Sequence, residues 1–366
     1  PTAARTSKSE RRGTARTPPP EARPAAPMKA LLESLLAAAN LTAEEAADGI
    51  EQIIAGADPC QAAAFLVLLK AKGETPQEVA GMVTAMRRHM VRVQPGCPTI
   101  DIVGTGGDGH HTVNFSTAAS IVMAACGAKV AKHGNRSVSS QCGSADVLEE
   151  LGVTLTLPPA AVERCVQQAG IAFMFAPAFH PAMKNIVPVR KALGVRTIFN
   201  ILGPLLNPAE CSRGLIGVYS EPMVKLMADV LHALGVEHCL VVHCGGLDEL
   251  APVAVAHVAW VTPAGVQLGS LDPFELGFAQ CTIEDLKGGD RVMNGRILTQ
   301  VLSGELSGPI TDTVVLNAGA ALYVNGTATS IQARAAACHH RRSCTHRRCC
   351  AHRRCCVLTP PPPPPP

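Results

Sequence analysis

The sequence predicts an α/β fold, in which a small N-terminal all-helical domain precedes a large α/β domain with a mostly parallel central sheet flanked by helices. Two observations predict this fold. Residues 28–95 carry helix-start signals and apolar residues at helical spacing. From Pro98 onward, short β-branched runs alternate with helical runs, which is typical of a parallel sheet. A chain of 366 residues has room for both parts.

The composition excludes several classes of protein. Hydrophobic residues make up 47% and charged residues 17%, as in a globular protein, and no apolar run reaches the about eighteen residues of a membrane span. Aromatic residues make up only 3%, so we expect no stacking surface and no nucleic-acid partner. The cysteines of the body are scattered without CxxC pairs, which is typical of reduced thiols.

The helical segment has three clear starts. Thr42-Ala43-Glu44-Glu45 is a capping box, Asp58-Pro59 combines a cap with a first-turn proline, and Thr75-Pro76-Gln77-Glu78 combines both signals. Apolar residues at helical spacing give each helix a buried face: Leu31, Leu35, Phe65, Leu66, Leu69, Val79, Met82, Val83 and Met86. We therefore expect this segment to build a core and a face for self-association.

The first candidate ligand loop follows the predicted strand Thr99 to Val103. Three glycines within Gly104-Thr105-Gly106-Gly107-Asp108 allow positive φ, so successive N–H groups can point into one concavity and bind anionic oxygens. Hydroxyls follow at the start of a predicted helix, whose N-terminal N–H groups favour anions. The alternative is an ordinary glycine-rich turn in which Ser116 or Thr117 caps the helix.

The second candidate loop, Lys132 to Ser140, follows a predicted strand from Ala128 to Ala131 and precedes a predicted helix from Asp146 to Leu151. It offers one ammonium group and several neutral donors. Both loops leave the carboxyl ends of strands, where open α/β sheets bind ligands. In the alternative to a ligand loop, Lys132 and Arg136 are a pair of solvated side chains on the surface.

Two later segments extend the pattern: Phe179 to Lys184, and Pro188 to Pro208, which includes PVRKALGVRTIFN. With GTGGD and the basic serine loop, they resemble the anthranilate phosphoribosyltransferase family from about Ala30 to Ile331. The resemblance implies transfer of a phosphoribosyl group from phosphoribosyl pyrophosphate to the amine of anthranilate, with Mg²⁺, in a homodimer. A pyrimidine nucleoside phosphorylase, which carries a related GTGGD and serine loop, is the alternative.

The resemblance also implies roles for individual residues. Anthranilate would contact Gly104, His133, Asn135 and Arg190. The planar guanidinium of Arg190 suits a carboxylate, although an ion pair within its own helix is the alternative. Lys132 and Arg190 would support the reaction by positioning and charge, and no nucleophile is predicted. Phosphoribosyl pyrophosphate would be held by Gly104, Gly107, Asp108, Thr112, Asn114, Ser116, Thr117, Lys132, Asn135, Ser139, Ser140 and Ser144.

A metal site is expected at Asp248-Glu249, which follows the apolar run Leu240 to Val242. Mg²⁺ prefers hard oxygen ligands and binds through one or two carboxylates plus substrate phosphates. The resemblance implies Ser116 as a third ligand. The loop between His243 and this acidic pair is one residue shorter than in the family. Without the surrounding pattern, such a pair is a common solvated surface feature.

Both ends of the chain differ from the body. Residues 1–27 are rich in Arg, Ala, Pro, Ser and Thr, like an organellar transit peptide, so we expect a plastid location, with a cytoplasmic one or a disordered leader as alternatives. Residues 334–366 form a low-complexity Arg/Cys/His and polyproline tail. The tail has three interpretations: a misread gene end, a Zn²⁺ site, or the nucleic-acid-binding part of a protein that is not an enzyme. The predicted domains are thus 28–95 (helical) and 96–333 (phosphoribosyl-binding), between these two ends.

Overall fold

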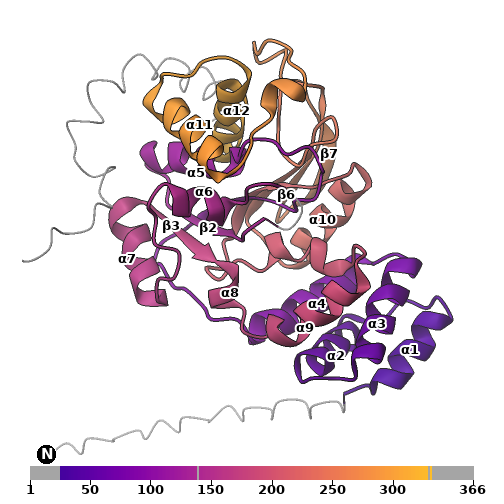
Figure 1. Cartoon of the computed structure of the whole chain (residues 1–366). Helices are drawn as coiled ribbons and strands as arrows, with labels where there is room; N and C mark the ends of the chain where they lie inside the picture. Colours follow the sequence, from indigo (N-terminus) through magenta and orange to yellow (C-terminus); the bar gives the residue numbers. More distant parts are fainter. Residues whose placement is uncertain (1–24, 138–139, 329, 332–366) are drawn as a thin grey trace, which may run out of the picture.

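The computed structural model describes residues 25–137, 140–328 and 330–331. Figure 1 shows a small helical domain beside a larger α/β domain, as the sequence predicts. A later helix, α9 (Met183–Leu193), packs on α2 and α3 of the helical domain, and α4 packs on α10 of the α/β domain. The helical domain opens with α1 (Met28–Leu36), α2 (Ala43–Ile54), α3 (Pro59–Lys72) and α4 (Pro76–Arg88).

The three predicted helix starts are confirmed. Thr42 and Thr75 each form a capping box, in which the hydroxyl accepts from the backbone N–H of a glutamate three residues later and the glutamate accepts in return. Asp58 accepts the N–H groups of Cys60 and Gln61 at the start of α3. Gly73 ends α3 with a φ of +89°, a conformation that favours glycine.

The sheet has seven strands in the order β3-β2-β1-β4-β5-β6-β7. Strands β1 to β5 run parallel to one another, and β6 and β7 continue the sheet as antiparallel strands at the β5 edge. The strands are β1 (Ile100–Gly104), β2 (Val130–Gly134), β3 (Ile171–Phe175), β4 (Arg213–Gly217), β5 (His238–His243), β6 (Ala256–Thr262) and β7 (Gly265–Leu271).

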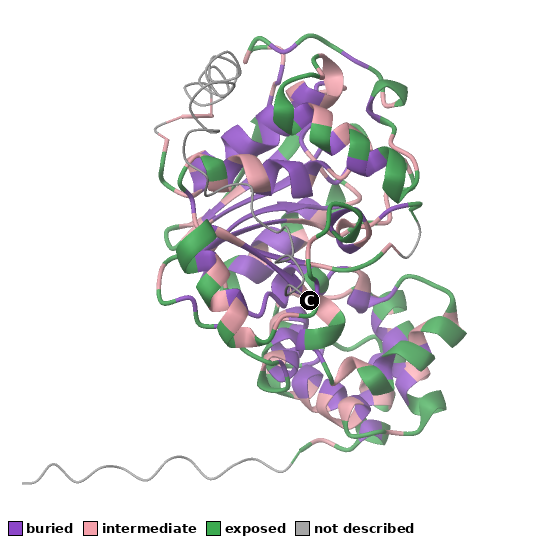
Figure 2. Ribbon diagram, turned by 60° about the vertical axis from the view of Figure 1, so that its left-hand side comes forward, coloured by how far each residue is buried: buried purple, intermediate pink, exposed green. Residues whose placement is uncertain are grey.

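Helices cover both faces of this sheet, and buried residues concentrate between the layers (Figure 2). One face carries α5 (Phe115–Ala125), α6 (Ser144–Glu150), α11 (Arg291–Ser303) and α12 (Pro309–Val324). The other face carries α7 (Pro159–Ala169) and α10 (Pro222–Ala233). The short elements are α8 (Ala176–Phe179), η1 (Ile198–Asn200), η2 (Gly203–Leu205) and η3 (Glu284–Leu286). Among the described helices, none is long and apolar enough to cross a membrane.

The boundaries around the second loop differ from the prediction. The strand expected over Ala128 to Ala131 runs instead over Val130–Gly134, because its pairing with β3 continues to Gly134. Lys132 and His133, which we expected in the loop, therefore lie in β2. The helix expected from Asp146 begins at Ser144, because Asp146 accepts the N–H of Gly143 and fixes the first turn.

Candidate active site

The site begins where β1 and β4 end side by side. Gly104 of β1 pairs with Gly217 of β4, and Asp248 lies against both. A Cβ atom at Gly104 would lie 2.2 Å from Oδ2 of Asp248, and one at Gly217 would lie 1.4 Å from the Asp248 carbonyl oxygen. Glycine is therefore required at both positions for close approach. After β1 the chain continues to β2 on one side of β1, whereas β4 pairs with the other side of β1. Open sheets bind ligands at the carboxyl ends of strands where the strand order reverses in this way.

The glycine loop has the predicted conformation. Gly106 and Gly107 have φ of +67° and +78°, and the Gly106 N–H donates to Oδ2 of Asp248 over 2.6 Å. The loop is also held from outside, because the guanidinium of Arg196 donates to the Gly107 carbonyl and lies 4.5 Å from the ring centre of Tyr219. Sequence reasoning did not assign Arg196 to the site, although it lies within the GVRTIFN segment.

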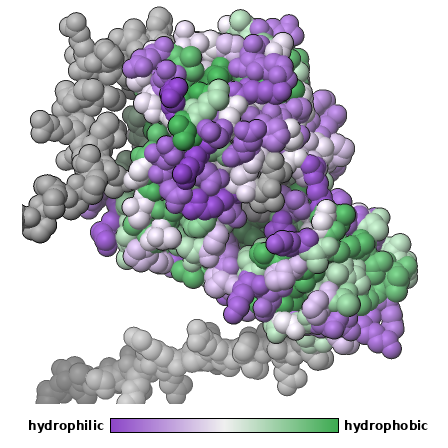
Figure 3. All heavy atoms as spheres, viewed as in Figure 1, coloured by the Kyte–Doolittle hydropathy of each residue, from purple (hydrophilic) through white to green (hydrophobic). Residues whose placement is uncertain are grey.

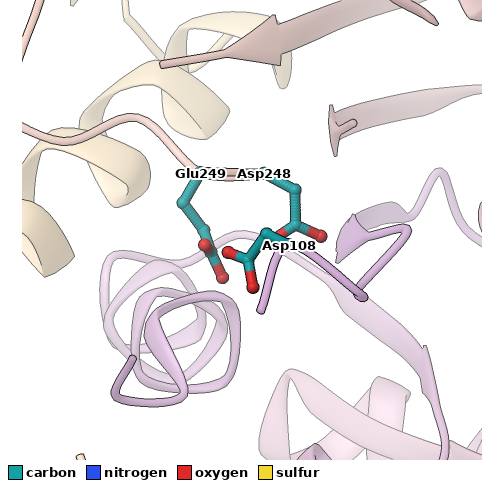
Figure 4. Close-up of side chains that lie close together, drawn as sticks. All are labelled: Asp108, Asp248 and Glu249. Atoms are coloured by element: carbon teal, nitrogen blue, oxygen red, sulfur yellow. The ribbon is translucent and has the colours of Figure 1, made fainter. Parts of the chain in front are cut away.

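Three carboxylates converge beside this loop. Ligand atoms of Asp108, Asp248 and Glu249 all lie within 4.8 Å of one another, and Figure 4 shows the side chains pointing toward a common point. Burial, and then the neighbouring Asp108 charge, raise the pKa of Asp248 to about 6. Burial and the Asp248 charge raise the pKa of Glu249 well above its ordinary value. Oε2 of Glu249 is buried and makes no hydrogen bond within the described residues.

The cluster fits a hard divalent cation. Like charges this close repel one another, and a buried oxygen without a donor carries a desolvation cost. Carboxylate oxygens are the ligands that Mg²⁺ prefers, and a cation would relieve both costs. The sequence predicts Asp248 and Glu249 as metal ligands but groups Asp108 with the phosphoribosyl-binding residues. Only the fold brings Asp108 to the acidic pair, since the two lie far apart along the chain.

Lys132 connects β2 to β1 and to the start of α5. The Lys132 ammonium donates to the Ser116 hydroxyl over 3.2 Å and to the Ile102 carbonyl over 2.6 Å. Lys132 is only 2% exposed, so its interpretation as a solvated residue is wrong. Burial lowers the pKa of Lys132, while the charges of Asp101 and Glu249 oppose that shift. Ser116 lies in the first turn of α5, and its role as a metal ligand stays a prediction.

The second loop is bound to α6. Arg136 donates to Asp146 and Glu149 over 2.9 Å each, and Asp146 also accepts the Ser137 N–H over 3.0 Å. Arg136 is exposed, as the surface alternative predicts. Ser140 bonds to Ser137 and the Cys142 carbonyl, Asn135 accepts the Arg136 N–H, and Ser144 is the first residue of α6. Ser139 lies outside the described residues.

The remaining predicted hydroxyl and amide groups lie at the start of α5. Asn114 is the N-cap but makes no capping bond with its side chain. It donates instead to the Cys142 carbonyl over 3.0 Å and accepts from Asn294 over 3.1 Å. Thr117 is buried and its hydroxyl has no partner in the described chain, so the alternative in which Ser116 or Thr117 caps the helix is wrong. Thr112 forms a backbone bridge with Lys287.

Of the predicted anthranilate contacts, His133 lies on the face of β2 opposite Lys132, whereas Gly104 ends β1, Asn135 follows β2 and Arg190 lies in α9. Nε2 of His133 lies 3.2 Å from Nε2 of His180, and burial lowers the pKa of His133 to about 3 and of His180 to about 4. Both rings are therefore neutral at pH 7. The Arg190 guanidinium lies 5.5 Å from the ring centre of Phe199 and forms no salt bridge with a described residue, so the ion pair within its own helix is wrong. His180 was not assigned from the sequence.

Together these features define a class of enzyme. A glycine loop, a buried lysine and clustered carboxylates at a sheet switch point form a site suited to a phosphorylated ligand, and the family models give the class as a glycosyl transferase. Residues 29–90 match the glycosyl transferase family helical bundle domain, and residues 96–341 match the glycosyl transferase family a/b domain. Within that class, the chain belongs to the anthranilate phosphoribosyltransferase family.

Individual relatives agree with this assignment. The anthranilate phosphoribosyltransferase of Chlamydia felis is 46% identical over 311 residues, which cover 83% of this chain and 89% of that protein. The crystal structure of the Thermus thermophilus enzyme is 42% identical, with a TM-score of 0.79 over 84% of this chain and 92% of that one. The Saccharomyces cerevisiae enzyme in complex with phosphoribosyl pyrophosphate and Mg is 26% identical, with a TM-score of 0.78 over 87% and 95%.

Proposed function

We propose that the carboxylate cluster and the two loops carry the reaction of this family. The chain is a pentosyltransferase that moves the phosphoribosyl group of 5-phosphoribosyl 1-pyrophosphate to the amine of anthranilate, in tryptophan biosynthesis. A bond forms between the amine nitrogen and the anomeric carbon, the bond from that carbon to pyrophosphate breaks, and the amine loses a proton. The observation that carries this proposal is the convergence of Asp108, Asp248 and Glu249 beside the glycine loop.

The cation is Mg²⁺ in this proposal, held by Asp108, Asp248 and Glu249, with Ser116 as the further predicted ligand. Bound there, Mg²⁺ would neutralise charge on the departing pyrophosphate. The relative from Saccharomyces cerevisiae in complex with phosphoribosyl pyrophosphate and Mg supports this choice. The glycine loop presents to the pyrophosphate oxygens the N–H groups that are not bonded to Asp248 or Gly217, and Lys132 adds an ammonium group whose charged form Asp101 and Glu249 favour against burial.

Anthranilate binds next to β2 in this proposal. The neutral imidazoles of His133 and His180 present an uncharged wall, and Arg190 faces the carboxylate of anthranilate with its planar guanidinium. A structure of the Saccharomyces cerevisiae enzyme in complex with 4-fluoroanthranilate supports a site for this class of acceptor. The amine of anthranilate is already neutral near pH 7, so positioning and electrostatic stabilisation suffice.

A fluorescence assay of anthranilate consumption with phosphoribosyl pyrophosphate and Mg²⁺ tests the function. We expect turnover in the wild type and none when Asp248 and Glu249 are both changed to Ala. The matched control is Asp58→Ala, which removes a carboxylate from the start of α3 in the helical domain and should leave turnover unchanged. Unchanged turnover in the double variant would remove the acidic pair from the metal site. Phosphorolysis of pyrimidine nucleosides without anthranilate turnover would favour the alternative enzyme.

The homodimer is the second part of the proposal. A groove of about 590 Å³ between α2, α3 and α9 is lined by Ala57, Ala63, Pro188, Ala192 and other residues. Hydrophobic residues gather on the helical domain in Figure 3, and Leu36 and Val67 are 70% and 40% exposed. A second copy of the chain would cover this surface.

Light scattering during gel filtration tests the dimer. We expect the wild type to elute with twice the mass of one chain, and Ala63→Glu to shift it toward the monomer, because a charge would then lie in an apolar interface. A wild-type monomer would contradict the proposal.

The plastid location also stays a proposal, and it rests on residues 1–27. Expression of those residues fused to a fluorescent protein in plant cells tests it, with a cytoplasmic signal as the contrary result.

A further inference from the structure

The strands β1 and β2, whose ends carry the two ligand loops, are barely paired by their backbones. Among the described residues their register is a single pair, Ile100 with Val130. By contrast, β1 pairs with β4 at five positions, from Ile100 to Gly104, and β2 pairs with β3 at five positions, from Val130 to Gly134. The backbone ladder therefore does not fix the distance between the glycine loop and the segment from Lys132 to Asn135.

Side chains link the two strands instead, and they do so from both faces of the sheet. On the face covered by α5, the Lys132 ammonium donates to the Ile102 carbonyl of β1 over 2.6 Å. On the opposite face, the Asp101 carboxylate accepts the His133 backbone N–H, at 3.3 and 3.4 Å from its two oxygens. These contacts satisfy backbone groups that a regular ladder would otherwise pair.

Asn207, from the segment that follows η2, completes the link. Its Nδ2 donates to Oδ2 of Asp101 over 2.7 Å and to the Ala131 carbonyl of β2 over 2.8 Å, so that one amide group bridges both strands. Its Oδ1 accepts the Ala209 N–H over 2.8 Å, which fixes the amide orientation. Asp101 and Asn207 are 4% and 5% exposed, so water does not compete for these bonds.

We propose that Asp101 and Asn207 are positioning residues for phosphoribosyl transfer, which set the spacing between the glycine loop and the Lys132–Asn135 segment. The inference rests on the proposed function, because both loops are taken to hold the same substrate. Neither residue touches that substrate in this account. From the opposite face of the sheet, the charge of Asp101 also raises the pKa of Lys132 and so partly offsets the effect of burial. A small change in the spacing misplaces the pyrophosphate contacts relative to the ribose contacts, and misplacement of about 1 Å is enough to cost a large factor in rate.

Two variants and one matched control test the proposal. Asp101→Asn keeps the shape but removes the charge and one acceptor, whereas Asn207→Ala removes only neutral bonds. The control is Glu78→Gln in the helical domain, since Glu78 is also a fully buried carboxylate paired with a lysine, Lys72, over 2.9 Å. All are compared as folded protein, well below their melting temperatures, by kcat, by KM for phosphoribosyl pyrophosphate and by melting temperature.

We expect Asp101→Asn to lower kcat and raise KM for phosphoribosyl pyrophosphate, each by about tenfold or more, and Asn207→Ala to change both in the same direction. Glu78→Gln should lower the melting temperature and change neither kinetic constant. If Asp101→Asn does not fold, Asn207→Ala decides. Kinetic constants equal to those of the wild type in whichever of the two variants folds would overturn the proposal and leave a structural role alone. Absence of turnover in the wild type would instead contradict the proposed function.

Discussion

The helical domain and the carboxyl edge of the sheet differ in whether their buried polar side chains have hydrogen-bond partners. In the helical domain, Glu78 is fully buried, yet it accepts bonds from the N–H groups of Leu41 and Thr75 and from Lys72. At the sheet edge, Glu249 has a buried oxygen without a donor, and the buried hydroxyls of Thr105 and Thr117 have no partner within the described chain. Among described residues 28–90, no such buried side-chain atom is unpartnered.

The difference fits a helical domain that serves stability and a sheet edge that serves ligands. Satisfied groups stabilise the fold, whereas clustered like charges and unpaired groups cost free energy and persist where a ligand requires them. Substitutions at the sheet edge should therefore lower activity without lowering stability, and substitutions in the helical domain should lower stability without lowering activity.

Glu249→Gln should lower turnover by about 10³-fold, because an amide is a poor Mg²⁺ ligand and the leaving pyrophosphate loses its countercharge. Stability without divalent cations should not fall, since the variant removes a buried carboxyl group whose ionised form is disfavoured by burial and by the two neighbouring carboxylates. Steady-state assays and thermal unfolding with a chelator measure the two effects. A variant that is both inactive and clearly less stable would contradict the contrast.

Glu78→Gln should have the reverse profile. The change leaves Lys72 without its buried carboxylate, and breaking a buried ion pair costs about 3 kcal/mol. Denaturant unfolding measures the loss, and the assay should show unchanged turnover per folded molecule. A loss of activity at full stability would mean that the helical domain takes a direct part in catalysis.

His180→Asn should change how stability depends on pH. The pKa of His180 falls to about 4 in the folded chain, below its ordinary value of about 6.5, so the unfolded chain binds the extra proton first as pH falls. The wild type therefore loses stability relative to the variant between about pH 6.5 and pH 4, by up to about 3 kcal/mol. Unfolding free energies of both proteins across this range check the slope. If the unfolding free energies of the two proteins change with pH by the same amount, the pKa of His180 is not lowered by folding.

The smallest effects concern two threonines. Thr42→Ala removes a capping hydroxyl and should destabilise the chain by about 1 kcal/mol without changing activity. Thr117→Val removes a buried hydroxyl that has no partner and should not destabilise the chain, but it should weaken phosphoribosyl pyrophosphate binding. Chemical unfolding and ligand titration of both variants measure this pair. Equal losses of stability would remove the distinction between the regions.

The sequence predicts the helical domain well, because its signals are local: a threonine and a glutamate three residues apart fix a helix start by themselves. The glycine loop and the acidic pair were also predicted, from their place after apolar strands. The end of β2 was misplaced, because pairing with β3 draws Lys132 and His133 into the strand. Asp108 in the cluster, Arg196, His180 and the Asp101–Asn207 link depend on contacts between distant segments, which no local pattern encodes.

Titration calorimetry of phosphoribosyl pyrophosphate into the wild type and Glu249→Gln, each with Mg²⁺ and with a chelator, tests the central claim most directly. The claim is that the carboxylate cluster binds the substrate through Mg²⁺. It predicts that chelation weakens binding to the wild type at least tenfold, about 1.4 kcal/mol, and that the variant binds weakly with or without Mg²⁺. Equal affinities of the two proteins, with the same response to Mg²⁺, would contradict it.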